Sequence, residues 1–192
     1  MEIGRCWARW GLASCCVPVL AVLLCGARAL AQEAPTAAGL ERQAQGAFIA
    51  GKYGAADENI RAAIGLAGTE DFNRLALLQG LIATRLGSDG RSLLAAAVAA
   101  HDNSTWPRPV IGYLLGERKL QQVADDERRS GNNALVKRRH ICELSFYAGA
   151  FARADAAYRF AELLFKKAIT ACDRDSPIRA MTDAEMAALA AQ

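Results

Sequence analysis

The sequence predicts an all-α protein made of consecutive helical hairpins, and three observations favour this class. Alanine, a strong helix former, dominates segment after segment, while proline occurs only 5 times in 192 residues. Apolar residues recur with helical spacing, and no segment shows the apolar–polar alternation of a half-buried strand. A seven-position pattern that begins at Ala44 returns at Gly149, 105 residues later. A repeated helical pattern is typical of a protein in which each hairpin buries its apolar face against the next one.

Residues 1–31 have the features of a secretory signal peptide. Arg5 and Arg9 precede an apolar run over 11–25, and Ala29-Leu30-Ala31 supplies the small residues that signal peptidase accepts. The apolar run of about 15 residues is shorter than the roughly 20 needed to span a bilayer, which argues against a membrane anchor. We therefore expect cleavage between Ala31 and Gln32 and export of residues 32–192.

Removal of this leader changes the composition of the mature chain. The full sequence has a formal net charge of +3 and 6 cysteines, and residues 1–31 contain three arginines, one glutamate and four of those cysteines. The remaining 161 residues carry a net charge of +1, which is too weak to indicate a nucleic-acid binder. Neither Cys15 nor Cys25 has a good lipidation motif before it. We expect a soluble periplasmic protein rather than a lipid-anchored one, and membrane association is not predicted.

The two copies of the pattern explain how such a hairpin packs. Small residues at Ala44 and Gly149 let the two helices approach closely, an aromatic residue opens the second helix, and a buried stripe continues at i+4 and i+7. The first copy comprises Ala44, Gly51, Tyr53, Ala56, Ile60, Ala63 and Ile64. The second copy comprises Gly149, Ala156, Tyr158, Ala161, Phe165, Ala168 and Ile169. Gly51 suits the positive φ that ends a helix, whereas Ala156 lacks that freedom, so we expect the second copy to depart from the first there.

This pattern resembles the tetratricopeptide repeat, whose period is about 34 residues, because 105 is three times 35. The resemblance implies a short α-α superhelix over 32–192, with repeats at 37–68 and 70–101, a degenerate one at 106–129, and a last one at 134–172. Helices are expected at 37–50, 55–67, 70–86, 89–101, 108–115, 118–129, 134–153, 156–171 and 183–190. The capping box Thr182-x-x-Glu185 would open the last helix, which would cover the exposed face of the final repeat.

A narrower resemblance lies between Trp106 and Cys172. Trp106-Pro107-x-Pro109-Val110 and Tyr113-Leu114-Leu115-Gly116 look like the degenerate repeat of NlpI-type bacterial envelope proteins. Cys142-Glu143-x-x-Phe146-Tyr147-x-Gly149 is similar to the last repeat of their relatives. The resemblance implies a helical adaptor that holds envelope proteases or cell-wall hydrolases near their targets.

The mature chain retains only Cys142 and Cys172, which favours one structural disulfide. Cys142 falls near the start of the last repeat's first helix and Cys172 at the end of its second, and antiparallel helices bring these ends together. The alternative is thiol chemistry at Cys142, although a C-x-x-C spacing is absent and His140 is the only evident base. His101, His140, Cys142 and Cys172 show no metal-ligand spacing, so neither a metal nor a cofactor is predicted.

Tyr147 and Phe151, spaced i and i+4, form a candidate aromatic pair in a partner-binding groove. The equally weighted alternative is that both side chains pack against the second helix. Basic residues around the expected loop at 130–133 indicate a solvated surface, with an acidic partner or lipid headgroups as the alternative. This cluster comprises Arg128, Arg129, Lys137, Arg138 and Arg139.

The sequence contains none of the common catalytic motifs, so no catalytic residue and no enzyme activity are predicted. The expected function is that of an exported protein–protein adaptor or scaffold in the bacterial envelope. Two alternatives remain open: a thiol-dependent envelope accessory factor, and a small structural subunit of an envelope complex.

Overall fold

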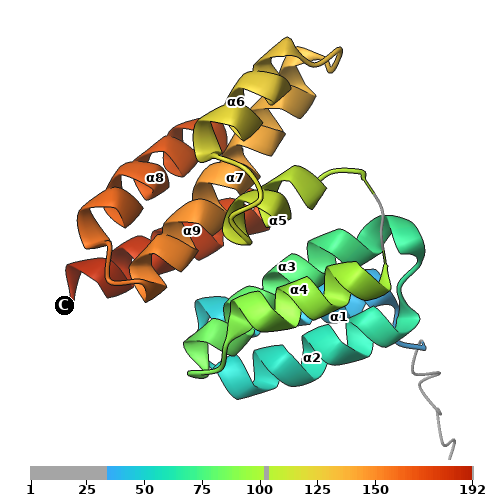
Figure 1. Cartoon of the computed structure of the whole chain (residues 1–192). Coiled ribbons are helices and arrows are strands. Elements are labelled where there is room, and N and C mark those ends of the chain that lie inside the picture. Colours follow the sequence, from blue (N-terminus) through green and yellow to red (C-terminus); the bar gives the residue numbers. More distant parts are fainter. Residues whose placement is uncertain (1–33, 102–103, 192) are drawn as a thin grey trace, which may run out of the picture. The chain divides into compact units, whose positions relative to one another are not determined.

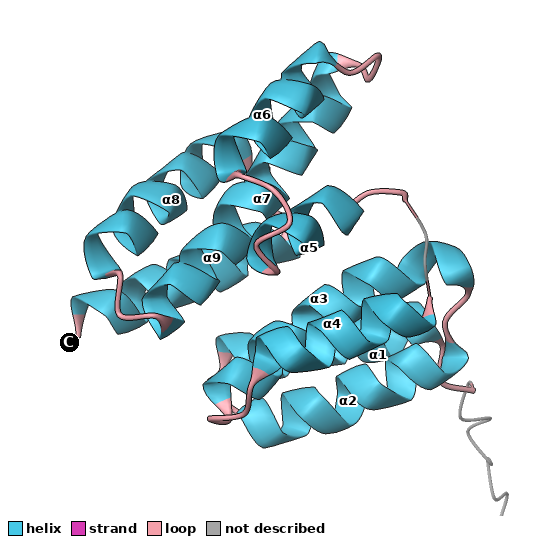
Figure 2. Ribbon diagram, in the orientation of Figure 1, coloured by secondary structure: helices cyan, strands magenta, loops and turns pink. Residues whose placement is uncertain are grey.

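The computed structural model describes residues 34–101 and 104–191, so the predicted leader and its cleavage site at Ala31 and Gln32 lie outside the described residues. Every regular element in this part is an α-helix, which confirms the all-α class (Figures 1 and 2). The helices are α1 (Ala37–Ile49), α2 (Tyr53–Leu66), α3 (Thr69–Arg85), α4 (Gly90–Ala100), α5 (Arg108–Leu114), α6 (Leu120–Arg129), α7 (Ala134–Ala154), α8 (Tyr158–Ala171) and α9 (Pro177–Ala190). All except α9 agree with the expected ranges to within two residues at each end.

Helices that are neighbours in the chain pack against each other in pairs. α1 contacts α2, α3 contacts α4, α5 contacts α6, and α7 contacts α8. Contacts of α2 with α3, α6 with α7, and α8 with α9 connect consecutive pairs, and α7 also contacts α3 and α5. None of the helices within 34–101 and 104–191 is long and apolar enough to cross a membrane.

The same left-handed turn closes all four hairpins. Its residues with positive φ are Gly51 (70°), Gly87 (80°), Gly116 (77°) and Ala156 (59°). Each is followed by a backbone N–H that donates to the carbonyl five residues earlier, at 2.8–2.9 Å, as in a Schellman motif. The expectation that Ala156 would depart from the pattern is therefore wrong. The hydrogen bonds of the turn hold alanine in a conformation that costs an L-residue about 1–2 kcal/mol.

The repeated positions lie where the two helices of a hairpin meet. The matched residues Ala44, Ala56, Ile60, Ala63, Ala161, Phe165 and Ala168 are all 0% exposed. A Cβ on Gly149 would lie 2.8 Å from the Phe165 ring, so only glycine permits this approach of α7 to α8. Tyr53 packs edge-on against Phe48, with ring centroids 5.4 Å apart. Tyr158, by contrast, is 47% exposed, so the two copies differ at this position.

The last helix starts earlier than expected. Its N-cap is Ser176, whose hydroxyl accepts a hydrogen bond from the Arg179 N–H at 3.2 Å. Pro177 follows as the first helical residue. Thr182 lies inside α9 and donates its hydroxyl proton to the Ile178 carbonyl at 2.7 Å, so the expected capping box with Glu185 does not form. The Ser-Pro sequence is the stronger start signal, because proline at the first helical position has the required φ and needs no N–H partner.

The position of α9 also differs from a simple cap on the last hairpin. α9 contacts α1 and α7 in addition to α8. Glu185 of α9 is 2% exposed and accepts two hydrogen bonds from Arg85 of α3, at 2.9 and 2.7 Å, and one from Arg153 of α7 at 2.8 Å. The side chains of Phe160 and Leu163 on α8 stay exposed instead. α9 therefore joins the first two hairpins to the last one.

Candidate binding cavity

A cavity of about 230 Å³ lies where α1, α3 and α7 meet the loop that leads into α9. Helices α1 and α3 contribute Glu41, Gln45 and Arg74 to its walls. Helix α7 contributes Arg139, Cys142, Glu143 and Tyr147. Pro107, Asp173, Ser176, Pro177 and Ile178 complete the lining. The cavity is thus built from five segments that are distant in the sequence.

Glu41 and Arg74 form the side of the cavity contributed by α1 and α3. Glu41 shares the buried stripe of α1 with Ala44 and Phe48, at i+3 and i+7, so the residue is only 6% exposed. The Arg74 guanidinium pairs with Glu41 and, at 2.7 Å, with Asp71. Burial opposes the charge of Arg74, but hydrogen bonds to these two carboxylates outweigh it and raise the pKa of Arg74 above its ordinary value. The Arg74 guanidinium is therefore already paired with the carboxylates of Glu41 and Asp71.

Glu143 and Tyr147 lie one turn apart on α7 and form the opposite side. The Trp106 indole Nε1–H donates to Glu143 Oε2 at 2.6 Å. Burial raises the pKa of the Glu143 carboxyl, and the hydrogen bond from Trp106 opposes this shift only in part. Tyr147 is 3% exposed, and its pKa is raised by burial and by the negative charges of Glu143 and Glu41. In the described ranges, no group forms a hydrogen bond with the Tyr147 hydroxyl.

A polar network behind this wall fixes Trp106. The Trp106 ring stacks on His140 of α7, with centroids 3.9 Å apart and planes 8° apart. His140 Nδ1 lies 3.0 Å from Glu127 Oε2 of α6, and Asn132 donates to the same carboxylate at 3.0 Å. Burial would raise the pKa of Glu127, but the contacts with His140, Asn132 and Ser130 together hold it below its ordinary value. The network therefore connects α6 and the 130–133 loop to the cavity wall.

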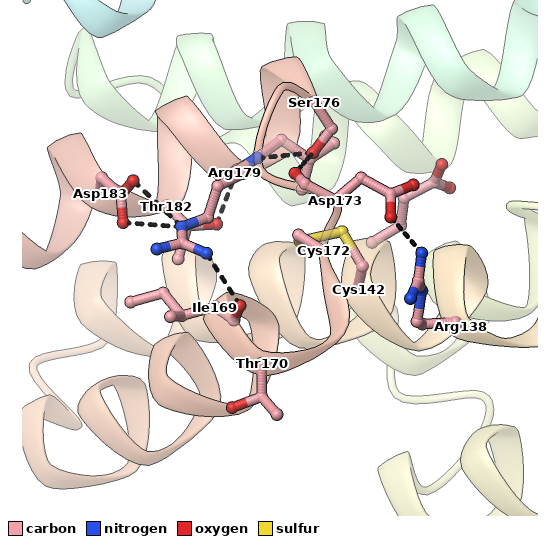
Figure 3. The surroundings of a disulfide bond; sticks show 12 residues. Arg138, Cys142, Ile169, Thr170, Cys172, Asp173, Ser176, Arg179, Thr182 and Asp183 are labelled. Carbon is pink, nitrogen blue, oxygen red and sulfur yellow. Dashed lines mark hydrogen bonds and ion pairs between the residues drawn. A yellow bond between two sulfur atoms is a disulfide. The ribbon is translucent and has the colours of Figure 1, made fainter. Parts of the chain in front are cut away.

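The disulfide fixes the loop at the rim of the cavity. Cys142 and Cys172 are joined with a Cα–Cα distance of 4.9 Å, in agreement with their predicted pairing (Figure 3). Arg138 pairs with Asp173, the next residue, and the Ser176 hydroxyl donates to the Asp173 carbonyl at 2.9 Å. Arg179 of α9 donates to the Ile169 carbonyl at 3.0 Å. The rim is thus tied to both helices of the last hairpin.

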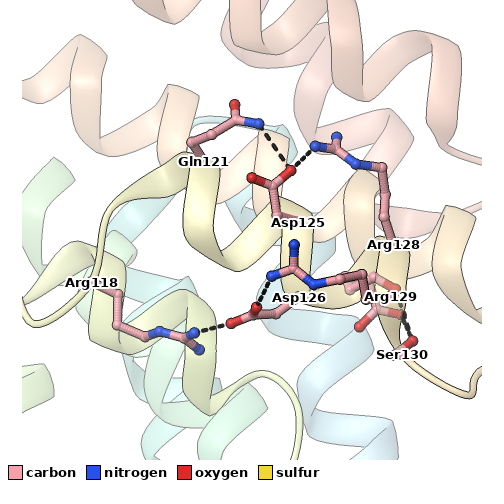
Figure 4. Close-up of polar contacts among 8 residues, drawn as sticks. Arg118, Gln121, Asp125, Asp126, Arg128, Arg129 and Ser130 are labelled. Carbon is pink, nitrogen blue, oxygen red and sulfur yellow. Dashed lines mark hydrogen bonds and ion pairs between the residues drawn. The ribbon is translucent and has the colours of Figure 1, made fainter.

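Most of the predicted basic cluster is neutralised locally. Arg128 pairs with Asp125, and Asp126 pairs with both Arg129 and Arg118 (Figure 4). The Lys137 ammonium donates to the Arg128 carbonyl at 2.8 Å, and Arg138 pairs with Asp173. Arg139 forms no ion pair with any residue that the structure describes. The cluster therefore forms a solvated surface on which most positive charges are paired with neighbouring carboxylates, apart from Arg139 at the cavity.

The structure separates the two aromatic residues of the predicted groove. Tyr147 lines the cavity, whereas Phe151 is 1% exposed and lies under the Arg91 guanidinium, 5.2 Å from the ring centroid. The prediction that Tyr147 and Phe151 form an aromatic pair in one groove is therefore wrong. Helix α7 packs against α3 and α5 as well as α8, and both side chains become buried. Only Tyr147 remains a candidate contact residue.

The sequence reasoning missed three cavity residues that the structure brings together. Glu41 occupies an apolar stripe, which is an unusual place for a carboxylate and is visible in the spacing of Glu41, Ala44 and Phe48. Glu143 lies four residues before Tyr147 and so shares its helix face. Arg74 could be recognised only from the tertiary contact of α3 with α1 residues.

The cavity presents hydrogen-bonding groups next to an apolar surface. Within the described ranges no three His, Cys, Asp or Glu side chains gather as metal ligands, and the two cysteines are joined to each other. The cavity offers carboxylates, a phenol and apolar proline and isoleucine surface. Neither a scan against protein-family models nor a search of curated proteins finds a match for this chain.

Proposed function

We propose that this chain is an exported, non-enzymatic adaptor of the bacterial cell envelope with a tetratricopeptide-like scaffold. The observation that carries the proposal is the cavity between α1, α3 and α7, which combines carboxyl groups, an apolar surface and a buried tyrosine that has no hydrogen-bond partner among the described residues. Export is inferred from the predicted signal peptide over 1–31. The partner classes suggested by the family resemblance are envelope proteases and cell-wall hydrolases.

The repeated hairpin geometry supports this scaffold. Four consecutive hairpins close with the same turn, and the matched small residues of the first and last hairpins are buried where their helices meet. Such hairpins hold α1, α3 and α7 at fixed positions, so the cavity is already formed before a partner segment binds. Less binding free energy is then lost to reorganisation of the site. The disulfide leaves no free thiol at Cys142, which favours the adaptor over a thiol-dependent accessory factor.

A photo-crosslinking experiment in the envelope tests the proposal. A benzophenone side chain at Gln45, on the cavity wall, should capture a discrete protein, whereas the same group at Lys167, on the exposed surface of α8, should not. The captured protein, once purified, should bind the purified full chain directly and bind a Tyr147→Phe variant more weakly. Equal crosslinking at both positions, or none at Gln45, would contradict a partner site at the cavity.

A second candidate is a structural subunit of a larger complex, which the exposed apolar residues of α8 favour. Tyr158, Phe160 and Leu163 are 47%, 41% and 64% exposed. Exposed aromatic residues are enriched at protein interfaces. In this case crosslinks would arise from the benzophenone at Lys167 on α8. Leu163→Glu would remove the chain from its complex and leave the result at Gln45 unchanged.

A further inference from the structure

The cavity walls carry oxygen acceptors that lack donors. Tyr147 is 97% buried, lines the cavity and has a hydroxyl without a hydrogen-bond partner in the described part of the chain. Glu143 receives a hydrogen bond from Trp106 on Oε2 alone, and Glu41 receives those of Arg74 and Gln45 on Oε1 alone. None of these oxygens is among the buried side-chain atoms without a partner in the described part of the chain, so they are accessible from the cavity, and a donor that enters it can bind them.

The cations already present do not satisfy these acceptors. Arg74 is shared between Glu41 and Asp71, and Asp173 is paired with Arg138. Arg139 is exposed at the cavity and unpaired with described residues, so solvent screens its charge. The lining therefore contains three carboxyl groups and two guanidinium groups. Its remaining unpaired acceptors are gathered around Tyr147.

The size and the apolar lining suit one extended side chain. At about 230 Å³ the cavity is smaller than the roughly 300–1,000 Å³ of small-molecule sites. Pro107, Pro177 and Ile178 offer apolar surface next to the polar wall. Arginine has this combination, with a methylene stem that packs on apolar surface and a planar head with five donors.

We propose that the cavity is the subsite for a single arginine side chain of a partner polypeptide. Its guanidinium donates to Glu143 and Glu41 and to the Tyr147 oxygen, while its stem packs on the prolines. That the arginine comes from a polypeptide rests on the proposed adaptor function, whereas the guanidinium specificity of the cavity does not.

The charges that face Glu143 predict a pH dependence. Arg74 from α3, Arg139 and His140 from α7, and the Trp106 indole favour its ionised form, but burial outweighs them and raises its pKa. A guanidinium on this carboxyl favours ionisation further, so its entry displaces a proton from the protonated fraction. Binding is therefore tighter at pH 7.5 than at pH 5.0.

A titration with n-butylguanidinium tests the subsite without any protein partner. The probe is added to the ¹⁵N-labelled, disulfide-bonded full chain, and the Trp106 indole N–H signal reports on Glu143 through their hydrogen bond. Saturable binding is expected, with butyrate producing no saturable shift. Glu143→Gln should weaken binding about tenfold, and Tyr147→Phe should weaken it several-fold. Glu162→Gln, on the surface of α8, is the matched control and should change nothing.

Each outcome is decisive. Tighter binding of butyrate than of butylguanidinium, or an unchanged affinity in Glu143→Gln, overturns the subsite. If Glu143→Gln does not fold, Tyr147→Phe decides in the same way. Guanidinium binding without a crosslink from Gln45 keeps the subsite and rejects the adaptor. A crosslink without guanidinium binding rejects the subsite alone.

Discussion

The first hairpin, α1–α2, and the last, α7–α8, share the same packing and the same turn but differ in their other side chains. Where the two helices of each hairpin meet, residues 105 positions apart occupy the same buried places, and both hairpins close with the same left-handed turn. The last hairpin carries chemistry that the first lacks: Cys142 and Cys172 correspond to Ala37 and Ala67. Helix α7 also has 21 residues against 13 in α1, and its additional turns include Arg138 and His140. The small residues at the crossing maintain the hairpin, so the remaining positions are free to differ.

The largest expected effect comes from breaking the link that joins both hairpins through α9. Glu185→Ala leaves Arg85 and Arg153 buried without their carboxylate, at 9% and 15% side-chain exposure. We expect the free energy of unfolding to fall by about 3–5 kcal/mol, as measured by urea denaturation. Asp183→Ala removes an exposed ion pair on the same helix and should cost less than about 1 kcal/mol. Equal losses in the two variants would argue against a special role for Glu185.

Removal of the disulfide should affect the last hairpin selectively. The bond closes a separation of 30 residues, so Cys142→Ser with Cys172→Ser should cost about 3.5 kcal/mol. Hydrogen exchange should rise in α8, in α9 and at the loop that lines the cavity, and much less in α1 and α2. Uniform loss of protection across all helices would contradict independent stabilisation of the last hairpin.

A converse change transfers the disulfide to the first hairpin. Ala37 and Ala67 occupy the places equivalent to the two cysteines, and Ala67 and Cys172 share the same extended C-cap backbone, with ψ of 143° and 144°. Ala37→Cys with Ala67→Cys should form a second bridge and stabilise the chain by about 2 kcal/mol, because engineered bridges give less than the ideal gain. Two thiols that stay free in mass spectrometry under oxidising conditions would show that the hairpins differ in geometry.

The turn residues offer a smaller and symmetrical test. Ala156→Gly relieves the positive φ of 59° and should stabilise the protein by about 1 kcal/mol. Gly51→Ala places the same strain in the first hairpin and should cost about as much. Thermal unfolding of the two variants and of the double variant, whose effects should cancel, measures this. A loss of stability in Ala156→Gly would contradict the equivalence of the turns.

The smallest expected effect concerns pH and two carboxyls that belong to the network around the last hairpin. The pKa of Glu143 is raised above its ordinary value of 4.5, so the folded state retains its proton longer, and stability falls as the pH rises through that shifted range. The pKa of Glu127 is lowered, so its contribution is present above 4.5 and is lost as the pH falls through the lowered value.

Glutamine variants separate these two contributions. Relative to the unchanged protein, the free energy of unfolding of Glu143→Gln should increase as the pH rises above 4.5. That of Glu127→Gln should decrease as the pH rises toward 4.5 from below, and the difference should stay constant above 4.5. Urea denaturation at a series of pH values measures both differences. Parallel pH dependence in the two variants would contradict opposite shifts of the two pKa values.

Local signals predicted the helices of the hairpins well, and they failed at α9. Glycine turns and apolar spacing act within a few residues, which is why α1 to α8 could be placed from the sequence. At α9 two start signals compete, and the Thr182–Glu185 box was preferred to Ser176-Pro177. Glu185 accepts hydrogen bonds from Arg85, 100 residues away, and such a distant partner leaves no mark in the local pattern.

The cavity was only partly predictable, for the same reason. Tyr147 could be singled out because it belongs to an aromatic pair on α7, and Glu143 shares its helix face. The groove position predicted for Phe151 was wrong, because α7 packs against α3 and α5 as well as α8, and Arg91 of another hairpin lies over the Phe151 ring. Glu41 could have been recognised as a carboxylate on an apolar stripe.

The sequence by itself determined the helical class, the hairpins, the turn at Gly51 and the pairing of Cys142 with Cys172, because these features depend on periodicity, on small residues and on the two ends of one hairpin. The tertiary structure alone decided that α9 joins α3 to α7 through Glu185 and that five distant segments form a cavity around Tyr147. These features depend on which charged and aromatic side chains meet across helices. That meeting is set by the packing angles of the whole stack, which no single segment encodes.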